Sequence, residues 1–307
     1  MFWALLAFIG ATTNAVYYVS IKKFLQTINP AALAGGGFLC SSLFLLSLSI
    51  YHGIPVIGSG FLFAVTGTSV INIVATILTF RALTSSDVSL AVPMIAFTPL
   101  FNIATAAVIL RELPSAIGIL GIAIIVAGSY VLNTSKEHTR ITDPFRAMIS
   151  HPGVVSMLMV AFLYSVAINF DKMVMLNSDV IFGSGVVFLL LGSFFSVVWI
   201  LSRGGIHDMF FRVPSPAPLD FSSGKKIRDW RKLTPLFFIG AILSIESIVI
   251  NLAYRDQIVP YVIAIKRMSL LLIVLYGAIV FHERDTFRRL AGASLMIAGA
   301  VLILLFP

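Results

Sequence analysis

The chain has 307 residues, of which 59% are hydrophobic and only 11% are charged, and its mean hydropathy is +1.01. These values exclude an ordinary soluble domain and indicate a membrane protein. The formal charge of +8 would suggest nucleic-acid binding in a soluble protein, but most Lys and Arg residues lie between apolar runs, where they set membrane orientation. We therefore expect membrane lipid around the chain and no nucleic-acid partner.

Ten apolar runs follow one another along the chain, each about as long as the roughly 20 residues that a helix needs to cross a bilayer. They span approximately residues 2–20, 31–51, 60–80, 87–110, 115–132, 153–170, 180–201, 234–253, 259–281 and 286–306. The sequence therefore predicts an all-α membrane protein with ten transmembrane helices. The first run lacks a basic leading segment and a cleavage site, which favours a retained helix over a signal peptide.

The two halves of the chain repeat each other. An offset of 150 residues pairs Lys22 with Lys172, and an offset of 171 residues pairs Glu112 with Glu283. Each repeat then holds five crossings, and because five is an odd number the two repeats must enter the membrane in opposite directions. The sequence therefore predicts two inverted five-helix repeats, an arrangement found in many alternating-access carriers.

The repeats also define the expected domains. The first covers residues 1–133, a linker covers 134–152 and the second repeat covers 153–307. The surplus residues of the second repeat fall in a long basic loop near 202–233.

The charges between the helices predict how the chain is oriented. Linkers after the odd-numbered helices hold 16 Lys and Arg residues, whereas those after the even-numbered helices hold only Arg111, Lys172 and Arg255. Positive loops stay on the cytoplasmic side of a membrane. We therefore expect an inner or plasma membrane protein with the linker 134–152 in the cytoplasm and both termini on the outer face.

A pattern of small and turn-forming residues recurs in both halves. The first half has Ala82-Leu83, Ala91-Val92-Pro93, Phe97 to Pro99, Glu112 and Gly121 to Gly128, and the second has Ala253, Glu283, Gly292 and Gly299. With this pattern the whole chain resembles the drug/metabolite transporter superfamily, specifically the ten-helix kind built from two EamA-type repeats. The second half departs from the pattern at Ala264 and Leu270, where the first half has Pro93 and Pro99. The resemblance implies a fold and a transport function, and it does not identify the substrate.

Three ionisable residues stand out inside the predicted helices. Such a residue costs about 2.5 to 3.5 kcal/mol on insertion scales, so it usually faces a cavity. Glu246 lies in the eighth helix and Lys266 in the ninth, each eight residues from the turn between them, so at about 1.5 Å per residue we expect them to meet at one depth. Arg267 adds a second cation, and one uncompensated positive charge favours a carboxylated or phosphorylated substrate.

Lys266 and Arg267 are adjacent in sequence, so they point about 100° apart on a helix, and one can face the substrate while the other pairs with Glu246. The alternative is a buried ion pair that only holds the eighth and ninth helices in register. The Lys-Arg pair is also similar to that in triose-phosphate translocators and related nucleotide-sugar carriers, and this resemblance implies that the cations engage phosphate. Glu246 is the candidate for proton coupling, and exchange against a counter-substrate is the alternative.

Other polar residues inside the predicted helices complete the expected substrate-binding set. For any one of them, an interhelical hydrogen bond is the alternative. They are Asn14, Tyr17, Tyr164, Asn169, Tyr261 and Ser269. Glu112 and Glu283 are expected to link helices, and the glycines at 121, 128, 292 and 299 are expected to bring the fifth and tenth helices close together.

No pattern in the sequence indicates catalysis or a cofactor. The five histidines lack metal-ligand spacing, and we find no nucleophile-base pair or nucleotide-binding loop. We therefore expect a secondary-active transporter, not an enzyme, that carries a small, polar, anionic metabolite by alternating access. The alternatives are an exporter of neutral amino acids or other metabolites, and a membrane accessory subunit that transports nothing.

Overall fold

The computed structural model describes residues 2–24, 28–85, 92–133, 152–201, 233–273 and 286–306. Within these residues the chain is helical throughout its regular structure and has no strand. The helices are α1 (Phe2–Phe24), α2 (Pro30–His52), α3 (Phe61–Ser85), η1 (Val92–Phe97), α5 (Thr98–Ile109), α6 (Ala116–Asn133), α8 (Pro152–Leu176), α9 (Val180–Leu201), α11 (Thr234–Asp256), α12 (Val259–Lys266) and α14 (Thr286–Leu305).

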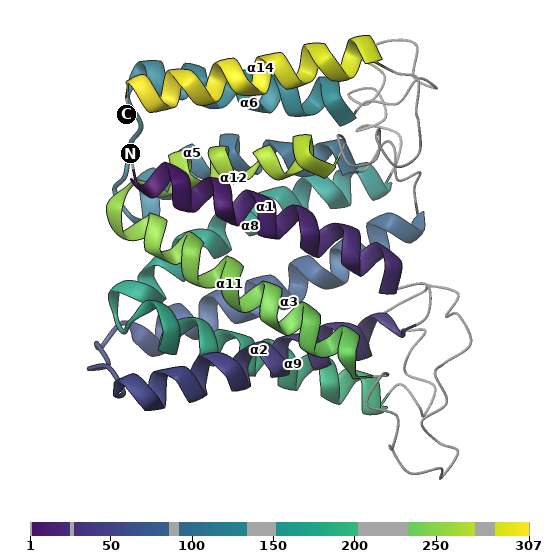
Figure 1. Cartoon of the computed structure of the whole chain (residues 1–307), viewed down its shortest axis with the longest axis vertical. Helices are drawn as coiled ribbons and strands as arrows, with labels where there is room; N and C mark the ends of the chain where they lie inside the picture. The colour runs from purple at the N-terminus through teal and green to yellow at the C-terminus, as the bar shows by residue number, and fades with distance from the viewer. Residues whose placement is uncertain are drawn as a thin grey trace.

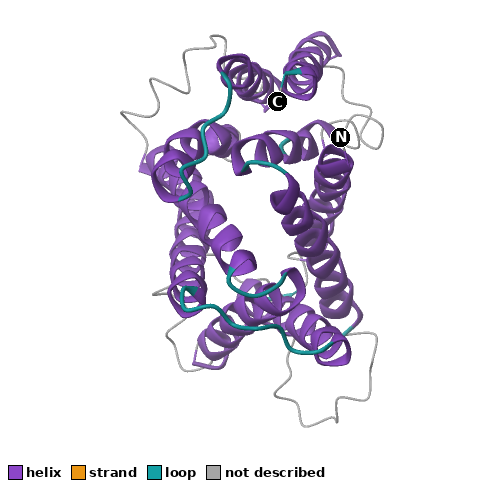
Figure 2. Ribbon diagram, turned by 90° about the vertical axis from the view of Figure 1, so that its left-hand side faces the viewer, coloured by secondary structure: helices purple, strands orange, loops and turns teal. Residues whose placement is uncertain are grey.

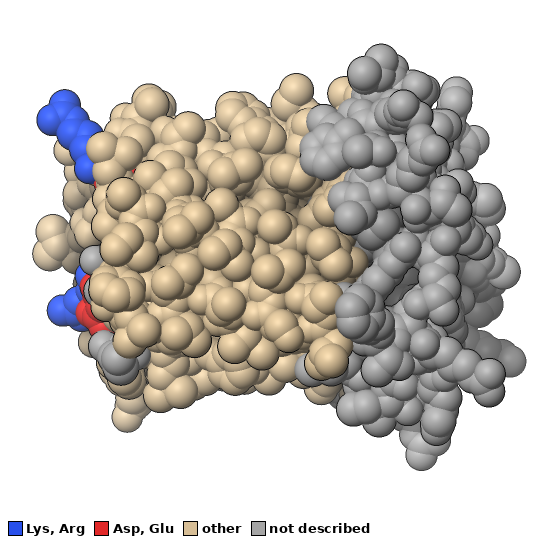
Figure 3. Space-filling view, turned by 90° about the horizontal axis from the view of Figure 1, so that it is seen from above, with Lys and Arg blue, Asp and Glu red and all other residues tan. Residues whose placement is uncertain are grey.

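The helices have the length and composition of membrane spans. By these two criteria α1, α2, α3, α8, α9 and α11 can each cross a bilayer, while the stretches 94–109, 116–132 and 290–305 are shorter apolar helices. Many large apolar side chains are exposed on their outer surface, and on the face in Figure 3 the charged side chains of the described residues gather at one end. The predicted all-α, multi-span fold is confirmed.

The fourth predicted span does not form one continuous α-helix. It begins as the 3₁₀ helix η1, and the α-helix α5 starts only at Thr98. Pro99 stands in the first turn of α5, where its missing N–H would have no partner in any case. Thr98 Oγ1 donates to the Ile95 carbonyl at 2.7 Å, which satisfies one of the carbonyls that the change of helix type releases.

The ninth predicted span is interrupted at Arg267. The Arg267 N–H is shared between the carbonyls of Ile263 at 3.1 Å and Ala264 at 3.2 Å, and Leu270 N–H bonds to the Arg267 carbonyl at 3.0 Å. These i to i+3 bonds tighten the helix for one turn, after which residues 268–273 are helical again. The rest of this span, and the linkers 134–151 and 202–232, lie outside the described residues.

The helices cross in alternating directions, so both chain ends lie at one end of the bundle (Figure 1). We call this the termini end. Figure 2 looks onto it, and shows the connecting loops drawn in teal crossing between the helices there.

The contacts between the two halves come in equivalent pairs, in which the two halves exchange roles. α1 packs on α11 while its equivalent, α8, packs on α3, and α5 packs on α8 while α12 packs on α1. The remaining equivalents pack on each other, α2 on α9 and α6 on α14. Contacts that exchange in this way are those of a two-fold relation between the halves, as the inverted repeat requires.

The glycines of α6 and α14 show this two-fold relation at atomic scale. A Cβ added to Gly128 would lie 2.7 Å from the Gly292 carbonyl oxygen, and one added to Gly121 would lie 2.9 Å from that of Gly299. The sequence repeat equates Gly121 with Gly292, yet Gly121 contacts Gly299, so the contacts are exchanged across an axis between the helices. The predicted close packing of these two helices is confirmed, and Figure 1 shows them together at one edge of the molecule.

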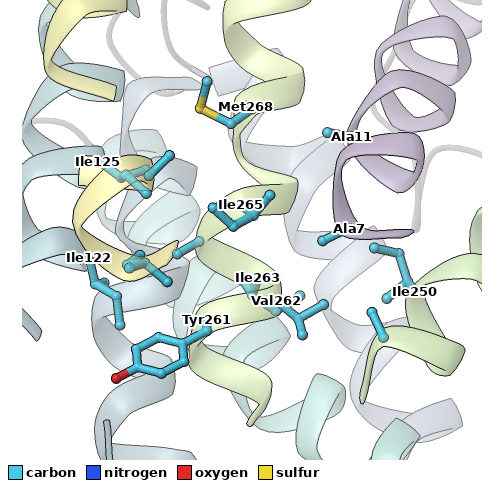
Figure 4. Packing of buried hydrophobic residues seen from close by; sticks show 14 of the residues in the cluster. Ala7, Ala11, Ile122, Ile125, Ile250, Tyr261, Val262, Ile263, Ile265 and Met268 are labelled. Carbon is cyan, nitrogen blue, oxygen red and sulfur yellow. The ribbon is translucent and has the colours of Figure 1, made fainter. Parts of the chain in front are cut away.

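The helix α12 is buried along its length before Lys266. Residues 259–265 are all buried, and all of them except Pro260 belong to one apolar cluster with residues of α1 and α6. Figure 4 shows α12 between Ile122 and Ile125 of α6 and Ala7 and Ala11 of α1, with Tyr261 on the side of Ile122. The charged pair that follows this segment, Lys266 and Arg267, therefore enters the interior of the bundle.

Candidate substrate-binding site

Three helices meet at the carboxylate of Glu246. Its Oε1 accepts a hydrogen bond from Asn14 Nδ2 of α1 at 2.8 Å and an ion pair from Lys266 Nζ of α12 at 2.7 Å. The side chain of Glu246 is 9% exposed and that of Lys266 is 27% exposed. The contact predicted from the equal distances to the α11–α12 turn is therefore present, and Lys266 is the cation that makes it.

Arg267 is placed differently from Lys266. Its Nε is buried without a hydrogen-bond partner, and no carboxylate of a described residue forms an ion pair with it. Its guanidinium lies within electrostatic range of Glu246 and of three tyrosines, Tyr18, Tyr164 and Tyr254. Arg267 is thus a permanent charge whose donors the described protein does not fully use.

The face of α1 that carries Asn14 also carries a residue within electrostatic range of Arg267. Ala7, Ala11, Asn14 and Tyr18 follow at spacings of four, three and four residues, so they share one face of the helix. Ala7 and Ala11 are completely buried, whereas Tyr18 is 41% exposed and within electrostatic range of Arg267. Along this face the residues are therefore buried toward the termini end, and Tyr18, further along, is partly exposed.

Asp171 is a further ionisable residue of this interior, and the sequence reasoning missed it. It lies on α8, which continues to Leu176 instead of ending near residue 170. Its Oδ1 accepts a hydrogen bond from Thr68 Oγ1 of α3 at 2.6 Å, and Lys266 is within electrostatic range. The sequence feature that could have indicated this is the apolar stretch after Asp171 and Lys172, because it allows the helix to continue past these two charged residues.

With Asp171 included, the net charge of the site differs from the one expected from the sequence. Two carboxylates, Glu246 and Asp171, now stand with two cations, Lys266 and Arg267. The expected surplus of one positive charge is therefore wrong when every group is ionised, because the four charges sum to zero.

A second charged cluster closes the termini end. Glu112, in the loop after α5, pairs with Lys172 Nζ of α8, and its Oε2 accepts the Val259 N–H at 2.8 Å. Lys172 also donates to the Gln257 carbonyl at 3.1 Å. Glu112 thus ties the first half to α8 and to the first turn of α12, which confirms its expected role in linking helices. Lys172 was expected in a loop, but it lies inside α8 and is 8% exposed.

Two of the predicted binding residues lie within electrostatic range of the interior charges. Tyr17 lies within range of Tyr18, Glu246 and Tyr164, and Tyr164 lies within range of Arg267. Tyr164 and Asp171 are seven residues apart on α8 and so share a face, about 10 Å apart along the helix.

Other predicted residues point elsewhere. Asn169 is fully buried and donates to Thr105 Oγ1 at 3.0 Å and to the Ser165 carbonyl at 2.8 Å, so it links α8 to α5. The Tyr261 hydroxyl accepts the Ser115 N–H at 2.9 Å and packs against α6. Asn169 is five residues from Tyr164 on α8, and Tyr261 is five residues from Lys266 on α12. Five residues correspond to a rotation of about 140° around the helix axis, so Asn169 and Tyr261 lie on a different helix face from the cluster.

Ser269 is 1% exposed, and its hydroxyl has no partner among the described residues. Within the same residues, no group of His, Cys, Asp and Glu is arranged to hold a metal ion. The chemistry available in the interior is therefore that of ion pairing and hydrogen bonding, from Asn14, the tyrosines and the four charged residues.

Comparison with known proteins agrees with this architecture. The chain matches a solved crystal structure over 99% of both chains, with a TM-score of 0.76 and 13% sequence identity, which establishes a common fold. No curated protein sequence matches it. Residues 1–134 match the EamA-like transporter family. With the second half repeating the first, the chain is a multi-pass membrane protein whose first half is similar to the EamA-like transporter family.

Proposed function

We propose that this protein is a secondary-active transporter of a small carboxylated or phosphorylated metabolite, with Arg267 as the group that contacts the anion. The observation that carries the proposal is the state of Arg267. Its Nε is buried and unpartnered, and no carboxylate of a described residue forms an ion pair with it.

The chemistry of a guanidinium explains why an anion is the expected occupant. Arg stays charged at any physiological pH, and a charge inside a membrane span is costly unless a partner compensates it. Carboxylate and phosphate match the planar fork of the guanidinium and form two hydrogen bonds with it. Tyr18 and Tyr164 add neutral hydroxyl groups within range of the same guanidinium, which can position the rest of a polar molecule.

An asymmetry between the halves supports transport by alternating access. Under the two-fold relation, the contact of α11 with α2 is equivalent to that of α3 with α9. In the structure α11 packs along α2 extensively, whereas α3 touches α9 much less. The chain therefore departs from symmetry in the manner of one state of a two-state carrier, whose other state would exchange the two contacts.

The second candidate is transport of a neutral, zwitterionic metabolite such as an amino acid. The observation in its favour is the sum of charges, since Lys266, Arg267, Glu246 and Asp171 add to zero when all are ionised. A zwitterion would then place its carboxylate near Arg267 without adding net charge to the interior.

A thermal-shift screen of the purified protein separates these readings, because a ligand raises the unfolding temperature of the state that it binds. The compounds are di- and tricarboxylates, phosphorylated sugars, nucleotides and neutral amino acids. We expect one anionic class to stabilise the wild type and to lose its effect in Arg267→Gln. The matched control is Arg255→Gln, which removes an exposed charge at the end of α11 and should leave the shift unchanged.

Equal stabilisation of Arg267→Gln and the wild type by every anion would overturn the assignment of Arg267. Shifts from neutral amino acids alone would replace the anion with a zwitterion. Flux of the stabilising compound into liposomes that contain only this chain would separate a transporter from an accessory subunit.

A further inference from the structure

Asp171 is a membrane-embedded carboxylate that forms no ion pair with a described residue. Its Oδ1 accepts one hydrogen bond, from Thr68 Oγ1 at 2.6 Å, and Thr68 is held in turn by Asn72 Nδ2 at 3.0 Å. Oδ2 accepts no hydrogen bond from a described residue and is not among the buried unpartnered atoms, so it faces accessible space.

Two other carboxylates of the described chain show what full compensation requires. Glu246 holds a lysine at 2.7 Å and an amide at 2.8 Å, and Glu112 holds a lysine and a backbone N–H. Among the described residues, Asp171 accepts a hydrogen bond from one hydroxyl group, that of Thr68. An ionised carboxylate with one neutral donor is costly inside a membrane, and binding a proton removes that cost.

The groups around Asp171 come from each helix that packs on α8. α3 contributes Thr68 and Asn72, α12 contributes Lys266, and α11 contributes the hydroxyl of Tyr254 within electrostatic range. α9, η1 and α5 contain no titratable residue, and Lys172 of α8 itself is engaged by Glu112. Lys266 is thus the cation whose field reaches Asp171, while its ammonium contacts Glu246.

We propose that Asp171 is the proton-binding site of the transporter and that a proton there binds together with the anion at Arg267. This inference rests on the proposed function for the identity of the anion. With Asp171 ionised, the four interior charges sum to zero and an incoming monoanion leaves the interior negative. With Asp171 protonated, the sum is +1 and the same anion makes the interior neutral.

The coupling follows from this difference in charge. The carboxylate takes up one proton from water to become a carboxylic acid, and it returns the proton to water when the anion leaves. Because linkage is reciprocal, a proton that strengthens anion binding is itself held more strongly when the anion is bound. A proton gradient can then drive the anion across the membrane in the same direction.

The test compares anion binding at about pH 5.5 and about pH 8, on either side of neutrality. The probes are isethionate, malate, succinate and glucose 6-phosphate, each tested on the wild type, Asp171→Asn and Arg267→Gln by thermal shift. Above the midpoint of the titration we expect the wild-type affinity to fall by about tenfold for each pH unit. In Asp171→Asn the affinity should be high and independent of pH, apart from the titration of the probe itself, and Arg267→Gln should bind about 10- to 100-fold more weakly than the wild type.

Asp256→Asn is the matched control, because Asp256 is exposed at the last residue of α11 and its removal should leave the pH dependence intact. If Asp171→Asn fails to fold, the proposal is tested by proton uptake in the wild type. An indicator dye measures this uptake while an anion solution, adjusted to the pH of the protein, is added. About one proton per bound anion is expected.

The outcomes separate the two proposals. An equal pH dependence in Asp171→Asn and the wild type, or anion binding without proton uptake, overturns the role of Asp171 and leaves the anion site standing. A dependence on sodium instead of pH, lost in Asp171→Asn, overturns the choice of the proton. Failure of every anion to bind at both pH values overturns the proposed function, and the coupling falls with it.

Discussion

The two charged clusters of this chain contain similar ionisable groups, but they differ in how many of their polar atoms have a partner. At the termini end, the oxygens of Glu112 are both occupied, by Lys172 and by the first N–H of α12. In the interior, Arg267 and Asp171 each have polar atoms that no described residue occupies. Saturated charges hold elements together, whereas unsaturated ones leave binding capacity for a ligand or a proton, so substitutions at the two clusters should have different consequences.

The largest effect on stability is expected from Lys172→Met. It leaves the Glu112 carboxylate, whose side chain is 16% exposed, without its cation. Breaking a buried pair in this way costs about 3 to 5 kcal/mol, which should appear as a large drop in the unfolding temperature in detergent. The double variant with Glu112→Gln should recover most of the loss, and a double variant as unstable as Lys172→Met would contradict this account.

Arg267→Gln should behave in the opposite way. Because no described residue forms an ion pair with Arg267, its loss should leave the unfolding temperature unchanged or raise it. Anion affinity should fall by about 10- to 100-fold, since a hydrogen bond to a charged group contributes about 1.5 to 3 kcal/mol. Equilibrium binding and unfolding, measured on the same preparation, check both parts, and a strongly destabilised variant would show that Arg267 is structural.

The two-fold relation between the halves can be tested at its glycines. In Gly128→Val the new Cβ would meet the Gly292 carbonyl oxygen at 2.7 Å, and in Gly299→Val it would meet that of Gly121 at 2.6 Å. Overpacking of this kind costs about 1 to 3 kcal/mol. The two variants occupy equivalent positions of the repeat, so their unfolding temperatures should fall by similar amounts, and a large difference would argue against equivalent packing.

The smallest effect is expected from Glu246→Gln. The glutamine can keep the hydrogen bond from Asn14, so stability should change little, but Lys266 loses its carboxylate. The interior then gains one positive charge, and anion affinity should rise by a few-fold to about tenfold, in line with weak coupling at an effective dielectric near 20. A titration of the thermal shift measures this change, and weaker binding would show that Lys266 needs Glu246 to be positioned.

The depth of a residue could be predicted from the sequence, but its direction could not. Glu246 and Lys266 are each eight residues from the turn between α11 and α12. Because the rise per residue of a helix is constant, both lie at the same depth, and they form an ion pair. Asn169 and Tyr261 have suitable depth and polarity, yet they face α5 and α6. Which face of a helix meets its neighbours depends on packing, which composition along a single helix does not reveal.

The sequence by itself determined that the chain lies in the membrane, that it crosses the membrane as α-helices, and that its two halves repeat each other. Apolar run length, the charges between runs and the repeated glycines encode these features directly. Only the tertiary structure decided that Lys266 holds Glu246 while Arg267 does not, and that Asp171 belongs to the interior. The physical reason is that these choices depend on the rotation of α12 at its tightened turn and on the extension of α8 past residue 170, both fixed by contacts between distant parts of the chain.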